Sequence, residues 1–89
     1  MKISEEKREK ISEQILAFLY SVSPHSAFTF HIAKEIARDE EFIKGILLSL
    51  EKKGLVLEVK KNPKGTPYSK RSRWSLSEGA YSAYKSRQQ

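Results

Sequence analysis

Residues 60–73 read KKNPKGTPYSKRSR, and this segment carries six basic side chains and no acidic one. Of the 17 Lys and Arg residues in the chain, the other eleven lie elsewhere and balance all 11 Asp and Glu residues, so the formal charge of +6 belongs to this segment. Pro63, Gly65 and Pro67 indicate a turn or loop. A cationic loop of this kind binds polyanions, and nucleic acid is the polyanion expected for so small a basic chain.

Alternating residues flank the cationic segment on both sides. Residues 55–61 alternate between an apolar and a mixed side, and residues 73–77 alternate around Trp74. Two such runs joined by a loop predict an antiparallel hairpin. We therefore expect a hairpin over about residues 55–77 with its projecting loop at 62–70.

Four other segments show the three- and four-residue apolar spacing of helices. They cover about residues 4–22, 29–37, 40–53 and 78–87, with a connector at 25–28 that could include a short extended piece. Ser4, Thr29, Asp39 and Ser77 are the predicted N-caps, and Gly54 is the predicted stop of the third helix. The second and third helices, joined by a tight turn at residues 38–39, form a helix-turn-helix unit.

The stretch FTFHIAKEIARDEEFIKGILLSLEKKGLV, residues 28–56, resembles the winged helix-turn-helix family, and so does RWSLSEG, residues 73–79. The resemblance covers residues 11–84 and implies one domain over residues 1–89. The expected fold is mainly α with a small β-hairpin (α+β), in the order helix, helix, helix, strand, wing, strand, helix. Similar domains serve as transcription regulators in archaea, bacteria, and archaeal plasmids and viruses. The resemblance thus implies double-stranded DNA as partner and a homodimer formed through the terminal helices.

The cations and hydroxyl groups of the wing are the predicted contacts to DNA phosphates. By the resemblance, the outward face of the third helix lies near the major groove. That face begins with acidic residues and offers no Arg, Asn or Gln for bidentate base contacts, so the wing is the stronger candidate. The predicted DNA-binding residues are Lys44, Lys60, Lys61, Lys64, Thr66, Tyr68, Lys70, Arg71 and Arg73, and the candidates for base readout on the third helix are Glu41, Gly45 and Leu48.

Several other functional classes find no support in the residues. The chain has no cysteine, which removes disulfides and thiolate metal sites. His31, Glu35 and Asp39 recur at four-residue spacing, but one His with two carboxylates is a poor zinc site, so no metal or other cofactor is expected. No nucleophile, base and orienting acid occur together, and no apolar run reaches the roughly 20 residues that span a bilayer. We expect a cytoplasmic protein that is neither an enzyme nor a membrane protein.

Two alternative functions remain open on the sequence. The acidic and apolar outward face of the third helix also suits a winged-helix protein-interaction module. A basic hairpin also grips the phosphates of A-form helices, so structured RNA is a second alternative to DNA.

Overall fold

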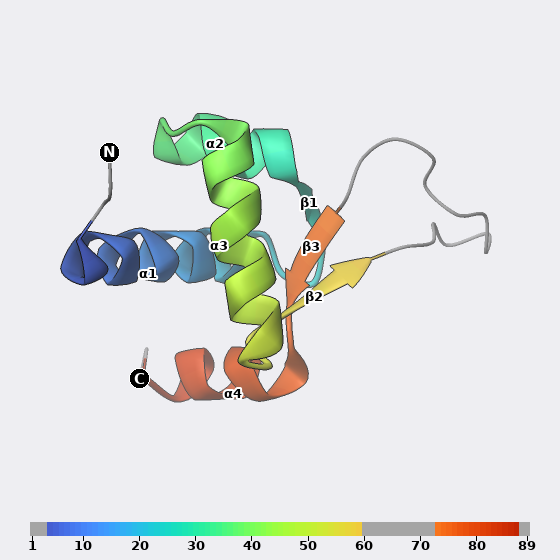
Figure 1. Ribbon diagram of the computed structural model, residues 1–89. Coiled ribbons are helices and arrows are strands. Elements are labelled where there is room, and N and C mark those ends of the chain that lie inside the picture. The colour runs from blue at the N-terminus through green and yellow to red at the C-terminus, as the bar shows by residue number, and fades with distance from the viewer. Residues whose placement is uncertain (1–3, 60–72, 88–89) are drawn as a thin grey trace.

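The computed structural model describes residues 4–59 and 73–87. The four helices and the hairpin follow the predicted order, and the α+β winged-helix fold class is confirmed (Figure 1). They are α1 (Glu5–Val22), β1 (Ala27–Phe28), α2 (Thr29–Ile36), α3 (Glu40–Lys52), β2 (Val56–Val59), β3 (Arg73–Leu76) and α4 (Glu78–Arg87). The predicted loop at 62–70 lies outside the described residues.

Side-chain caps start three of the helices. The Ser4 hydroxyl accepts a hydrogen bond from the amide of Lys7 at 3.2 Å, and Asp39 Oδ2 accepts one from the amide of Phe42 at 3.2 Å. Before α4, the Ser77 hydroxyl accepts from the amide of Ala80 at 3.1 Å. Each cap satisfies a helix N–H that has no partner within the helix, which explains why these helices begin where they do.

The predicted cap of α2 was wrong. Thr29 is the first residue of the helix and Phe28 occupies the cap position without a side-chain hydrogen bond. The hydroxyl of Thr29 instead accepts a hydrogen bond from Trp74 Nε1 at 2.8 Å, and both side chains are buried. A buried indole N–H needs an acceptor. The hydroxyl that local spacing predicted as the helix cap therefore binds Trp74, which lies 45 positions away in the sequence.

The sheet has three strands in the order β1-β3-β2, all antiparallel, where the sequence predicted a two-stranded hairpin. The additional strand, β1, comes from the segment expected to be a connector. Arg73 at the start of β3 pairs with Phe28 on one side and Val59 on the other, and Trp74 pairs with Ala27 on the β1 side. The central strand of the sheet is therefore the one that follows the cationic segment.

The core lies between the helices and the inner face of this sheet. Figure 1 shows α1 crossing behind α3, with α2 above, α4 below and the sheet to the right. Trp74, 0% exposed, is the largest fully buried side chain among the described residues. The buried apolar residues are Ile11, Ile15 and Leu19 of α1, Ile32 and Ala33 of α2, Ile43, Ile46, Leu47 and Leu50 of α3, and Ala27, Val56 and Trp74 of the sheet.

The turn between α2 and α3 contains a residue in the left-handed region. Ala37 has φ 61° and ψ 48°, and its amide donates to the carbonyl of Lys34 at 3.2 Å. The amide of Arg38 donates to the carbonyl of Ala33 at 3.0 Å, which closes the helix end. An L-residue with a Cβ is strained in this conformation, whereas glycine adopts it without strain.

We expect Ala37→Gly to stabilise the protein by about 0.5–1 kcal/mol, because relief of left-handed strain exceeds the entropy that glycine loses on folding. Thermal unfolding followed by circular dichroism should show a midpoint that is higher by a few degrees. Ala83→Gly is the matched control, because Ala83 is exposed inside α4 and should lose about 1 kcal/mol. A lower midpoint for Ala37→Gly would mean that this backbone strain is absent.

Candidate nucleic-acid interface

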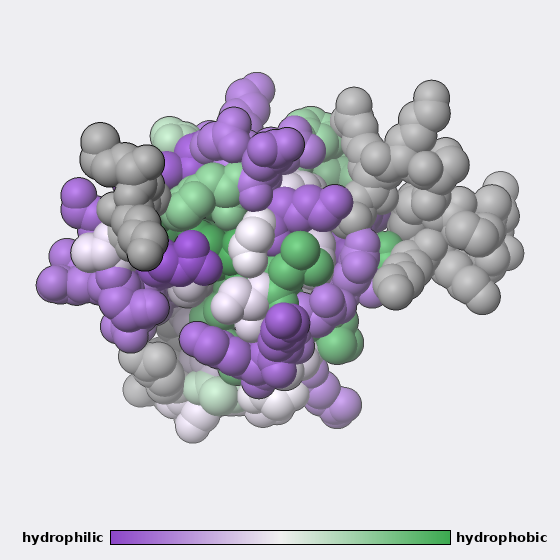
Figure 2. Space-filling model, in the orientation of Figure 1, coloured by the Kyte–Doolittle hydropathy of each residue, from purple (hydrophilic) through white to green (hydrophobic). Residues whose placement is uncertain are grey.

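The outward face of α3 gathers four of the residues singled out from the sequence. Ile43, Ile46, Leu47 and Leu50 turn toward the core and hold the helix in place. On the opposite side the helical spacing of three and four aligns an exposed row, and Figure 2 shows hydrophilic side chains around a paler strip on this face of the molecule. The row consists of Glu41, Lys44, Gly45 and Leu48, the last of which is 43% exposed.

The acidic start of α3 is explained by helix stability. The carboxylate of Asp39 caps the helix, and Glu40 and Glu41 lie in the first turn, where the helix dipole favours negative charge. Lys44 follows one turn later on the exposed row. The leading end of α3 therefore repels phosphates, and cationic contact from this face depends on residues further along the helix.

Gly45 lies inside α3 on the exposed row, where glycine costs about 1 kcal/mol relative to alanine. A Cβ built at this position would meet no heavy atom of the described residues within 4 Å. Packing within the described part of the chain therefore does not require a glycine here. The bare backbone at Gly45 would let another molecule approach the helix closely.

Arg73 is the one wing cation that the described part of the chain contains. Its Nη2 donates to the carbonyl of Ser26 at 3.2 Å, and its Cζ lies 4.8 Å from the centroid of the Phe28 ring. The side chain is half-buried against β1. These contacts hold the guanidinium on the sheet, and direct contact of Arg73 with a phosphate stays a prediction.

The other predicted wing contacts belong to the segment between β2 and β3. Lys60, Lys61, Lys64, Thr66, Tyr68, Lys70 and Arg71 lie outside the described residues. The structure does show the two strand residues between which this segment runs. Val59 and Arg73 are paired neighbours at one end of the sheet, so the cationic segment leaves and re-enters the fold at the same edge.

Sequence reasoning missed an aromatic cluster beside that edge. The rings of Phe28 and Phe30 lie 5.7 Å apart with an interplanar angle of 19°, and the Phe30 and His31 rings lie 4.2 Å apart. Phe28 belongs to a two-residue strand, which is too short for any period to show in the sequence. Ala27, Phe28 and Thr29 alternate between buried and half-buried positions because β1 pairs with β3, a strand that is distant in the sequence.

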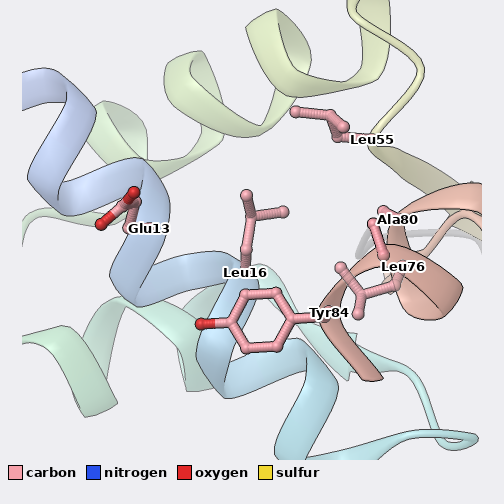
Figure 3. A pocket seen from close by; sticks show the side chains of 7 residues that line it. Glu13, Leu16, Leu55, Leu76, Ala80 and Tyr84 are labelled. Atoms are coloured by element: carbon pink, nitrogen blue, oxygen red, sulfur yellow. The ribbon is translucent and has the colours of Figure 1, made fainter. Parts of the chain in front are cut away.

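A groove opens on the other side of the molecule, between α1 and α4, with a volume of about 270 Å³. Figure 3 shows Leu16 of α1, Leu55 of the turn between α3 and β2, and Tyr84 of α4 directed toward it, with the carboxylate of Glu13 at one end. The contact between the two helices includes Tyr20, whose ring lies 5.4 Å from that of Tyr81 and 5.1 Å from that of Tyr84. No side chain of α4 between residues 78 and 86 is fully buried, so this helix keeps apolar surface exposed to solvent.

Within 4–59 and 73–87 no three His, Cys, Asp or Glu side chains come together in a group that could hold a metal ion. That part of the chain also includes no helix with the length and apolar character needed to cross a bilayer.

Several solved structures resemble this fold. The S. aureus MepR–DNA complex superposes with a TM-score of 0.71 at 20% identity, covering 91% of this chain and 66% of that chain. The Streptomyces coelicolor transcriptional regulator PcaV with its natural ligand has a TM-score of 0.64 at 14% identity, covering 93% of this chain and 51% of that one. A zinc-responsive MarR family member, Lactococcus lactis ZitR, has a TM-score of 0.61 at 15% identity, covering 96% and 51% respectively.

These similarities establish the winged-helix fold of the chain. The chain spans about half to two thirds of the length of the three structures. No protein-family model matches the sequence, and none of the curated proteins compared with it matches.

Proposed function

We propose that this protein binds double-stranded DNA and regulates transcription, with the cationic wing on the phosphate backbone and α3 near the major groove. The observation that carries the proposal is the position of the two candidate elements. The helix that carries the exposed row, α3, is separated from β2 by three residues, and β2 and β3 flank the segment that contains the net charge of the chain. A helix that fits a groove beside a cationic hairpin is how winged-helix proteins grip a duplex.

The proposal includes a homodimer formed through the terminal helices. The support is the groove between α1 and α4, whose walls are mostly apolar and contain Leu16, Leu76 and Ala80. An isolated helix as short as α4 is marginal in water, so it gains stability from any surface that covers it. A second copy would bring a second wing to the same duplex. Sedimentation at the concentrations used for binding measures whether that copy is present.

The direct test is a titration with matched duplexes of DNA and RNA at several salt concentrations. We expect submicromolar binding to DNA that weakens steeply with salt, because each phosphate contact releases counterions. Sequencing the DNA fraction retained from a random pool then shows whether bases are read. Tighter binding to the RNA duplex at equal salt would favour the RNA alternative.

A protein-interaction module is the second candidate, and the composition of the exposed row favours it. Glu41 and Leu48 on the same face suit a protein surface with a cation and an apolar pocket. This candidate predicts no preference for a DNA duplex over heparin, together with the capture of a polymerase or replication subunit. Either result alone is weaker than the two combined.

Gly45→Ala distinguishes a DNA-facing helix from a solvent-facing one. The substitution should raise the free energy of unfolding by about 1 kcal/mol, since alanine favours the helix and the added methyl group has open space around it. If α3 enters the groove with its backbone close to the DNA, the same methyl group should weaken duplex binding several-fold.

Gly79→Ala is the matched control for that variant. Gly79 is also an exposed helical glycine with open space around its Cβ position, but it lies on α4, remote from the exposed row of α3. It should stabilise the fold and leave DNA binding unchanged. Equal binding by wild type, Gly45→Ala and Gly79→Ala would remove close approach of α3 from the mechanism.

A further inference from the structure

Arg73 occupies the junction between the cationic segment and the sheet. It is the first residue of β3, and its two cross-strand neighbours are Phe28 of β1 and Val59 of β2. Val59 is the last residue of β2, so the segment that follows β2 rejoins the sheet at its own starting point. Arg73 therefore lies where both ends of the segment meet the sheet.

The guanidinium of Arg73 contacts β1 and the residue that precedes it. It donates through Nη2 to the carbonyl of Ser26 at 3.2 Å and lies 4.8 Å above the Phe28 ring. Phe30 stacks on Phe28 with ring centroids 5.7 Å apart, which holds that ring in place. A planar guanidinium makes the hydrogen bond and the ring contact together, whereas a lysine ammonium is a point charge that cannot match both.

The inner face of β3 also contacts the segment at the start of α2. Successive residues of a strand face opposite sides, so Trp74 points into the core where Arg73 points out. Trp74 Nε1 donates to the hydroxyl of Thr29, the first residue of α2. Because Thr29 directly follows Phe28, β3 is bound on both faces to the segment that begins α2.

We infer that Arg73 is a positioning residue that fixes the base of the wing relative to the helix-turn-helix. In this role the guanidinium binds Ser26 and Phe28 and does not contact DNA. It affects DNA binding by setting the direction in which the wing leaves the sheet. The inference rests on the proposed DNA-binding function, because the role of Arg73 is to raise the affinity for a DNA duplex. This role differs from the phosphate contact predicted for Arg73 from the sequence, and the variants described next distinguish the two.

Two variants test this role without removing charge from the chain. Arg73→Lys keeps the cation, and Phe28→Leu removes the ring beneath it while the position stays apolar. Each should weaken binding to a DNA duplex about tenfold, and the double variant should lose little more, because both changes break one contact. Arg8→Lys is the matched control, since Arg8 lies on α1 near its N-terminal end, remote from the sheet (Figure 1).

A second measurement follows the sheet in the absence of DNA. Amide hydrogen exchange at Ala27, Phe28 and Trp74 should quicken in both variants, while exchange at Ile46 and Leu47 in α3 stays unchanged. Faster exchange together with weaker binding supports the positioning role.

The remaining outcomes each contradict a specific statement. If Arg73→Lys binds like wild type and Phe28→Leu has no effect, Arg73 acts as a phosphate contact or has no part in binding. Unchanged exchange in both variants would show that the contact with β1 does not hold the sheet, which overturns the inference. If wild type binds no duplex, the proposed function fails, whereas intact wild-type binding with unaffected variants defeats the positioning role alone.

Discussion

The double variant Lys70→Gln/Arg71→Gln is expected to bind every DNA duplex about 10- to 100-fold more weakly at roughly 0.1 M salt. Both residues belong to the segment that holds the net charge of the chain. Each cation that contacts a phosphate releases a condensed counterion, and this entropy gain is lost when the cation is removed. The slope of the logarithm of the binding constant against the logarithm of the salt concentration should fall by about two. The loss should be similar for all sequences, because phosphates carry no base identity.

Arg73 stays unchanged in this experiment because its guanidinium is held on β1 and its removal would disturb the sheet. Lys7→Gln/Lys10→Gln is the control, since it removes the same charge from an exposed face of α1. Fluorescence anisotropy at four or more salt concentrations yields both the affinity and the slope. If the wing variant and the α1 control lose the same affinity, only the net charge of the protein affects DNA binding. The wing would then make no specific contact with phosphates.

Trp74→Ala is expected to cost about 3–5 kcal/mol of folding free energy, the largest loss of any single substitution considered. Trp74 is fully buried in the central strand of the sheet, belongs to the apolar core and donates a hydrogen bond to Thr29 of α2. Small domains have a free energy of unfolding of roughly 5–15 kcal/mol in total, so this variant should lose a large share of its stability. Equilibrium denaturation in urea, followed by circular dichroism, measures the loss.

A gentler pair of substitutions isolates the hydrogen bond from the packing. Thr29→Val keeps the shape of the side chain but leaves the buried indole N–H without its acceptor, which should cost about 1–3 kcal/mol. Trp74→Phe removes the donor and some volume. The double variant should lose less than the sum of the two, because it has neither partner left unsatisfied. Strict additivity would mean that the 2.8 Å contact contributes nothing to stability.

Local chemistry was sufficient to predict the helices and the hairpin. Ser4 and Asp39 accept the hydrogen bonds expected of helix caps, and the apolar spacing in α3 turns its four buried residues toward the core. Gly54 follows the helix with φ 78°, the left-handed conformation that a glycine at that position predicts. These features depend on residues within one or two helical turns of one another, so a single sequence contains all the information needed.

The candidate interface was only partly open to the same reasoning. The exposed row of α3 follows from helical spacing once the inward residues are known. The pairing of Arg73 with β1 does not, because Ser26 lies 47 positions away and its backbone carbonyl has no signature in the sequence. A charge in a basic run looks identical whether it points to solvent or to a neighbouring strand.

The sequence by itself determined the order of the helices and the hairpin and the place of the net charge, because periodicity, capping and charge are properties of neighbouring residues. Only the tertiary structure decided which side of each strand faces inward and which polar groups pair. Alternation in β2 left two choices, and the fold buries Val56 completely while Leu57 remains 52% exposed. That choice, like the attachment of β1 and the hydrogen bond between Thr29 and Trp74, depends on surfaces that meet only when distant segments pack together.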